Sequence, residues 1–147
     1  MTMFKHILLP TDGSELSMRA VRQGAKLAKL LGARVHAFHA IPAFHTFTYV
    51  TELLEATREE YNAQAVSRAE RYLATVRDIA KAEGVACDSS HIVCDDPYEA
   101  IVDEAQKRGC DLIVMASHGR RGAKAVLLGS ETLKVLTHSK VPVLVYR

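Results

Sequence analysis

Residues 111–116 read DLIVMA, an almost wholly apolar run with the length of one β-strand. Such a run is typical of a parallel strand that helices cover on both faces, because neither face of the strand then meets water. The sequence therefore predicts a strand here, at the centre of a parallel sheet.

The segments on either side alternate between apolar runs of strand length and longer stretches of helical periodicity. Strands that are separated by helices require right-handed crossover connections, which produce a parallel sheet. We therefore predict an α/β fold, a doubly wound sheet with helices on both faces. The other expected strands are 4–9, 33–41, 85–94 (at an edge, because its middle is polar) and 141–146, and the expected helices are 14–32, 52–83, 96–109 and 130–138.

Two of these helices carry clear signals at their ends. Ser14 is a typical N-cap and Gly32 a typical C-cap for the first helix. For the helix that starts at Asp96, Pro97 suits the first helical position and Glu99 completes a predicted capping box.

Composition narrows the class of protein. With 147 residues the chain has the length of a single domain, 1–147, without room for a separate substrate domain. Its 48% hydrophobic and 24% charged residues exclude a disordered chain. The net charge of +2 is too small to indicate nucleic acid or an anionic membrane as the partner.

The N-terminus turns polar too early for a signal peptide or a membrane span, so we expect a cytoplasmic protein. Without disulfide or zinc spacing, three cysteines are expected to be core thiols: Cys87, Cys94 and Cys110.

Ligands of doubly wound sheets bind beyond the carboxyl ends of the strands, near the point where strand order reverses. Two loops of this chain qualify. Residues 10–14 (PTDGS) place an acid directly after the first strand, where it can reach a ribose hydroxyl or a metal. Residues 116–122 (ASHGRRG) follow the inner strand and rejoin a helix at 129–132 (GSET). Their glycines allow close backbone approach, and the helix start points its amides at an anion.

Common nucleotide fingerprints are absent from the second loop. The chain has no G-x-G-x-x-G motif, and the stretch 119–124 lacks two residues that a Walker A motif needs, which argues against a P-loop NTPase. Ser117-His118-Gly119, followed after nine residues by Gly129-Ser130, instead closely resembles the G-x-x-G-x9-G-[S/T] ATP-binding signature of the universal stress protein family. The segments 7–17 (ILLPTDGSELS) and 141–147 (VPVLVYR) are similar to that family's first and last strands, so the resemblance covers essentially the whole chain.

The resemblance implies a single five-stranded domain of the adenine nucleotide alpha hydrolase-like type, with strand order 3-2-1-4-5. It also implies a homodimer and bound ATP, with Mg²⁺ or Mn²⁺ held mainly by the phosphates. The first glycine of the signature is Ala116 here. Because the end of a strand at negative φ tolerates a methyl group, nucleotide binding is still expected.

The same resemblance assigns roles to single residues. Asp12 would bind the ribose, Pro10 and Thr11 would shape the base and sugar pocket, and the backbone of Ala40 would contact adenine. The phosphates would be wrapped by the loop and then held at the following helix start, by Ser117, His118, Gly119, Arg120, Arg121 and Gly122, and by Gly129, Ser130, Glu131 and Thr132.

Other interpretations of these residues stay open. Asp12 is equally suited to capping the first helix. Arg120, Arg121 and Lys124 fit either a solvated loop or a phosphate contact. A catalytic role for Ser117 and His118 is disfavoured, since neighbours in sequence seldom form a Ser–His hydrogen bond and no orienting acid lies nearby. The aromatic residues of 43–50 suit a partner surface, a lid over the base or packing under the long helix, and these are Phe44, Phe47 and Tyr49.

Three functions remain in view. The first is an ATP-binding regulatory protein whose nucleotide-loaded state is read by a partner. The second is a slow ATP hydrolase that uses Asp12, and the third is a nucleotide-free dimeric scaffold. Because a bare apolar edge strand is usually covered by pairing, the last strand predicts a homodimer through 141–146.

Overall fold

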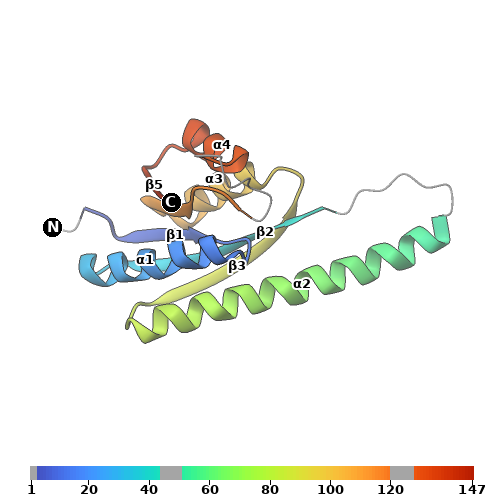
Figure 1. Cartoon of the computed structure of the whole chain (residues 1–147), viewed down its shortest axis with the longest axis horizontal. Coiled ribbons are helices and arrows are strands. Elements are labelled where there is room, and N and C mark those ends of the chain that lie inside the picture. The colour runs from blue at the N-terminus through green and yellow to red at the C-terminus, as the bar shows by residue number, and fades with distance from the viewer. Residues whose placement is uncertain (1–2, 44–50, 120–127) are drawn as a thin grey trace.

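The computed structural model describes residues 3–43, 51–119 and 128–147, without the side chains of 51–56. One five-stranded sheet forms the middle of the molecule, and every pair of neighbouring strands is parallel (Figure 1). The order β3-β2-β1-β4-β5 confirms the expected fold. The strands are β1 (His6–Pro10), β2 (Arg34–Pro42), β3 (Cys87–Cys94), β4 (Leu112–Ala116) and β5 (Val143–Tyr146).

All five residues of β4 are buried, as its apolar sequence predicts. The prediction that it forms the sheet centre is wrong by one strand, because β1 occupies the middle position and β4 lies beside it. Every residue of β1 is also buried. The polar strand β3 lies at an edge, as predicted, since an edge strand tolerates polar side chains better than an inner one.

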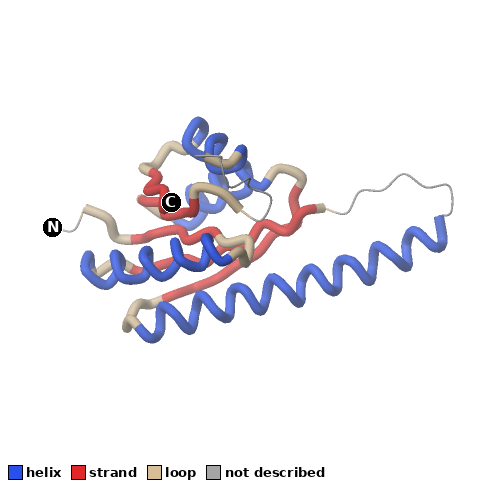
Figure 2. The backbone as a smooth tube through the Cα atoms, viewed as in Figure 1, coloured by secondary structure: helices blue, strands red, loops and turns tan. Residues whose placement is uncertain are grey.

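In the described part of the chain, two helices cover each face of the sheet. Figure 2 shows one pair above the strands and the long helix of the other pair below them. Side chains alternate along β1, so that Ile7 and Leu9 pack against one pair of helices and Leu8 against the other. The first face carries α1 (Glu15–Leu31) and α2 (Thr51–Ala82), and the second carries α3 (Pro97–Arg108) and α4 (Ser130–His138). None of the helices described is both long and apolar enough to cross a membrane.

Helix α1 begins and ends as predicted. The Ser14 side chain accepts a hydrogen bond from the backbone N–H of Ser17 at 3.2 Å, and Gly32 closes the helix at φ 65°. The capping box predicted for α3 is wrong, because the Asp96 side chain makes no capping hydrogen bond. Glu131 Oε2, from the start of α4, accepts the N–H of Tyr98 at 2.9 Å instead.

Helix α2 extends well past the end of the sheet in Figure 1. Where it crosses the end of β2, Ala65 and Ala69 pack against Ile41 in a small cluster of their own. The predicted aromatic loop, with Phe44, Phe47 and Tyr49, lies outside the described residues.

The three cysteines are free thiols. Cys110 is buried, and burial raises the pKa of its thiol to about 11. Cys87 and Cys94 are only half-buried, so the expectation of core thiols holds fully for Cys110 alone.

Candidate functional site

A pocket of about 680 Å³ opens at the carboxyl ends of β1, β2 and β4. This volume lies within the range of small-molecule sites, and the position is the one expected for a doubly wound sheet. The pocket brings together both loops that the sequence singled out. The predicted site residues that line it are Pro10, Thr11, Asp12, Ala40, Ala116, His118, Gly119, Gly129, Ser130, Glu131 and Thr132.

The remaining predicted residues stand differently. Ser117 is buried, 2% exposed, and does not line the pocket. Arg120, Arg121 and Gly122, together with Lys124, lie outside the described residues.

The loop after β1 is held in shape by its own side chains. Asp12 Oδ1 accepts the N–H of Ser14 at 2.9 Å, and Thr11 Oγ1 accepts the N–H of Gly13 at 3.1 Å. Gly13 has φ 80°, a left-handed conformation that favours glycine, and the ring of Tyr72 occupies the space where a side chain would stand. Asp12 therefore shapes the turn with one oxygen while it lines the pocket, and the helix cap itself is Ser14.

The loop after β4 is packed closely against the start of α4. The N–H of Gly129 donates to the carbonyl of Ser117 at 2.6 Å, and an ideal Cβ on Gly129 would lie only 3.1 Å from His118 Cα. Thr132 Oγ1 donates to the carbonyl of Ala116 at 2.9 Å, both groups being buried. These contacts fix the N-terminus of α4 beside the end of β4, with its first amides near the pocket.

Ser117 and His118 form a contact that their adjacency in sequence does not predict. Ser117 Oγ and His118 Nδ1 lie 3.2 Å apart, so the expectation of no Ser–His hydrogen bond is wrong. Ser117 follows β4 directly, and its carbonyl accepts the N–H of Gly129, which holds this part of the loop beside the start of α4. The serine hydroxyl is nevertheless buried, and no carboxylate among the described residues bonds to the imidazole, so the pair lacks the orienting acid of a catalytic triad.

Glu131 faces the pocket but already has partners. Besides the N–H of Tyr98, its carboxylate meets Lys134 Nζ at 3.7 Å. The hydrogen bond to Tyr98 joins the start of α4 to the start of α3. A carboxylate also repels phosphate, which disfavours a direct contact between Glu131 and a phosphate group.

One wall of the pocket comes from α2, a helix that holds none of the predicted site residues. The residues of this wall begin with Tyr61, and the others stand 4, 7 and 11 positions after it, a spacing that places all of them on one face of a helix. That periodicity is visible in the sequence, but the direction of the face is set by packing against β2. The α2 residues of this wall are Tyr61, Ala65, Arg68 and Tyr72.

His39, at the end of β2, also lines the pocket without having been predicted. Its Nδ1 donates to the carbonyl of Thr11 at 2.7 Å, and its ring meets the Tyr72 ring edge-on, with centroids 5.3 Å apart. Burial lowers the pKa of His39, and nearby Arg68 lowers it further. A neutral His39 thus ties the loop after β1 to β2 and α2.

Comparison with known proteins gives a consistent result. The model of the universal stress protein family matches residues 3–147. Universal stress protein MJ0577 of Methanocaldococcus jannaschii is 32% identical over an alignment of 155 residues, which covers 99% of this chain and 96% of that protein. MJ0531 of the same organism is 30% identical over 153 residues, covering 99% of this chain and 83% of that protein.

Solved structures agree with the sequence comparison. The structure of MJ0577 has a TM-score of 0.84 at 30% identity, over 97% of this chain and 95% of that one. A universal stress protein in complex with cAMP has a TM-score of 0.72 at 26% identity, over 98% of this chain and 97% of that one. Because the family model and these relatives match along nearly the whole length, this chain belongs to the universal stress protein family.

Proposed function

We propose that this protein binds an adenine nucleotide, ATP in the first place, in the pocket above the sheet, and that a partner protein reads the nucleotide-loaded state. The observation that carries the proposal is the meeting of two loops: the Asp12 turn after β1 faces Gly119 and the start of α4 across one pocket. The cAMP complex of a family member adds support, since that ligand is also an adenine nucleotide.

In this proposal each wall has its own task. The second carboxylate oxygen of Asp12 accepts a ribose hydroxyl, while the first keeps the turn closed through Ser14. The backbone of Ala40 contacts adenine beside Pro10 and Thr11, which line the same pocket.

The phosphates lie at the other wall. Gly119 and Gly129 allow them to approach the backbone, and Ser130 presents the start of α4, where free amides favour an anion. Arg120, Arg121 and Gly122 complete this wall in the proposal. Mg²⁺ or Mn²⁺ is bound mainly through the phosphates, as is usual for a small divalent ion that keeps several of its waters.

Calorimetric titration with ATP, ADP and AMP tests the binding. We expect saturable binding of at least one nucleotide, and loss of that binding in Gly119→Val with the fold retained by circular dichroism. Absence of binding by the wild-type protein at millimolar nucleotide would contradict the proposal. Partner reading is tested separately, by comparing proteins captured on the ATP-loaded chain and on Gly119→Val.

We also propose a homodimer formed through 141–146. Within the described part of the chain, β5 pairs with β4 on one side only, and Leu144 on it is 49% exposed. Leu133 and Leu136 of the neighbouring α4 are 54% and 39% exposed. Light scattering should give twice the monomer mass at micromolar concentration and the monomer mass for Leu144→Arg. A monomeric wild-type protein would rule the dimer out.

A further inference from the structure

The pocket has little positive charge of its own in the described part of the chain. The carboxylates of the described residues that line it are those of Asp12, Asp95 and Glu131. Among the described residues that line the pocket, Arg68 is the one Lys or Arg, and its side chain is half-buried. No hydrogen bond or ion pair joins the Arg68 guanidinium to another described residue. A half-buried guanidinium that is not ion-paired to a described residue is suited to binding an anion from the ligand.

The neighbours of Arg68 on α2 fix where it stands. Four residues later, the ring of Tyr72 packs over Gly13 and beside His39. Three residues earlier, Ala65 packs against Ile41. Arg68 therefore lies over the end of β2, next to the turn that carries Asp12.

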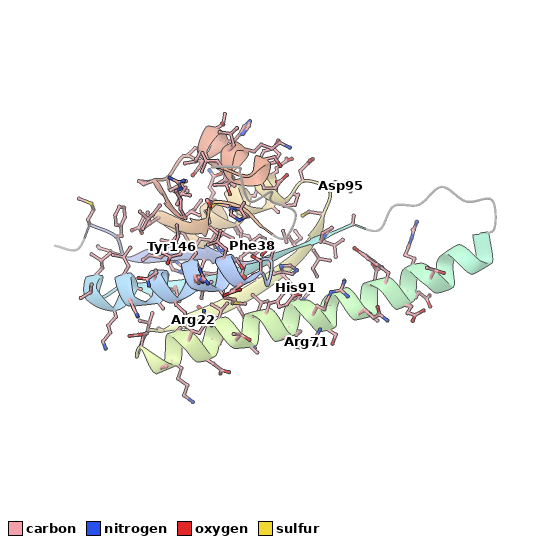
Figure 3. All side chains as sticks on the ribbon, viewed as in Figure 1. Arg22, Phe38, Arg71, His91, Asp95 and Tyr146 are labelled. Atoms are coloured by element: carbon pink, nitrogen blue, oxygen red, sulfur yellow. The ribbon has the colours of Figure 1, made fainter. Side chains whose placement is uncertain are left out.

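The proposed phosphate wall lies on the other side of the sheet. Gly129 and Ser130 belong to the start of α4, which covers the opposite face from α2 (Figures 1 and 3). A phosphate chain held at Ser130 thus extends away from Arg68. The guanidinium is left for an anionic group at the ribose end of the ligand.

Resting on the proposed function, we propose that Arg68 binds a phosphoryl group carried by the ribose, so that the pocket prefers a nucleotide phosphorylated at the 2′ or 3′ oxygen as well as at the 5′ position. A planar guanidinium matches the oxygens of a phosphate in geometry as well as in charge. Dinucleotide-binding sheets use the same chemistry, an acid for a free ribose hydroxyl and a nearby arginine for a ribose phosphate. This pocket holds both, in Asp12 and Arg68.

Titration calorimetry with AMP, adenosine 2′,5′-bisphosphate and adenosine 3′,5′-bisphosphate tests the preference and identifies the oxygen. We expect one bisphosphate to bind the wild-type protein at least about tenfold more tightly than AMP, since a charge-assisted hydrogen bond contributes roughly that factor. In Arg68→Gln the affinity for that bisphosphate divided by the affinity for AMP should fall to about one. Arg68→Lys, which keeps the charge but loses the planar fork, should retain part of the ratio.

Arg71→Gln is the matched control. Arg71 stands on the next turn of α2, is exposed and does not line the pocket, so its loss should leave the ratio unchanged (Figure 3). Thermal melting of all variants shows whether they are folded.

Each contrary outcome has a definite meaning. Equal affinities of AMP and both bisphosphates for the wild-type protein, or a preference that survives in Arg68→Gln, would overturn the inference. An equal loss of affinity for all three ligands in Arg68→Gln would also overturn it, because Arg68 would then contact the base or the 5′-phosphate. ATP is titrated in parallel: if the wild-type protein binds none of these nucleotides the proposed function has failed, whereas ATP binding without a preference rejects only the role of Arg68.

Discussion

Gly119 and Asp12 approach each other so closely that a side chain on residue 119 would overlap the Asp12 carboxylate. The two residues follow different strands, Gly119 after β4 and Asp12 after β1. At their other ends the same two strands are joined by Lys5 and Asp111, which are 106 positions apart in the chain. At one end of this strand pair, the Asp111 carboxylate accepts the backbone N–H groups of Lys5 and His6. At the other end, the missing side chain of Gly119 leaves the pocket open.

This contact makes Gly119 the most sensitive point of the proposed site. Gly119→Ala should weaken nucleotide binding and Gly119→Val should abolish it, because the added atoms displace the Asp12 carboxylate and narrow the pocket. Residue 119 is exposed, so melting temperatures should stay close to that of the wild-type protein. Calorimetry measures the binding, and unchanged affinity in both variants would show that the loop does not contact the ligand.

Asp12→Asn separates binding from hydrolysis. If the protein turns ATP over with Asp12 as the catalytic group, this change should lower the rate by about 10²–10⁴-fold. A rate measured by phosphate release that does not respond to the substitution would point to a contaminating ATPase. The amide keeps the shape of the carboxylate and can still accept the N–H of Ser14, so the turn should fold as before.

Glu131→Ala tests the contact between α4 and α3. Removing the carboxylate leaves the N–H of Tyr98 without its cap, which should lower the free energy of unfolding by about 0.5–2 kcal/mol. Nucleotide affinity should hold or rise, since a negative charge disappears from the pocket. Urea denaturation and calorimetry measure the two effects, and a loss of affinity with unchanged stability would instead assign Glu131 to the ligand.

The buried histidines predict destabilisation by acid. Burial lowers the pKa of His6, His36 and His39 below the ordinary value of 6.5. Below that pH the histidines bind protons in the unfolded chain but not in the folded chain. Their contribution to the free energy of unfolding is therefore fully present above pH 6.5 and is lost as pH falls through the folded pKa values. Each histidine contributes a slope of at most about 1.4 kcal/mol per pH unit.

Urea denaturation at pH 7.5 and pH 5.5 checks this dependence. His36 is bound to Ser90 at 2.7 Å and lies 3.8 Å from Glu104, with Arg108 beside them, and His36→Asn should flatten the dependence. The exposed His138→Asn serves as the control and should leave the slope unchanged. Equal stability of the wild-type protein at both pH values would refute the expectation.

Much of the fold can be predicted from short stretches of the sequence. Apolar runs predict the strands, and Ser14 and Gly32 predict the ends of α1, because strand burial and helix capping depend on residues close together in the chain. The α3 cap is not local. Asp96 is a residue type that often caps helices, and it stands at the N-cap position of α3. Because α4 packs against α3, however, it is Glu131 that accepts the backbone N–H of Tyr98.

The sequence also predicts the two loops of the candidate site, since both follow the carboxyl ends of expected parallel strands, where ligands of doubly wound sheets bind. It does not predict the α2 wall. Tyr61, Ala65, Arg68 and Tyr72 show a helical spacing, but that spacing fits any packed surface.

The sequence by itself therefore determined the alternation of strands and helices, the family, and the two loops that face each other across the pocket. Only the tertiary structure decided that α2 lines the pocket with Arg68 and that Glu131 caps α3. The physical reason is distance along the chain. Strand burial and turn conformation depend on neighbouring residues, whereas these two contacts exist because helices on separate crossovers pack onto one sheet.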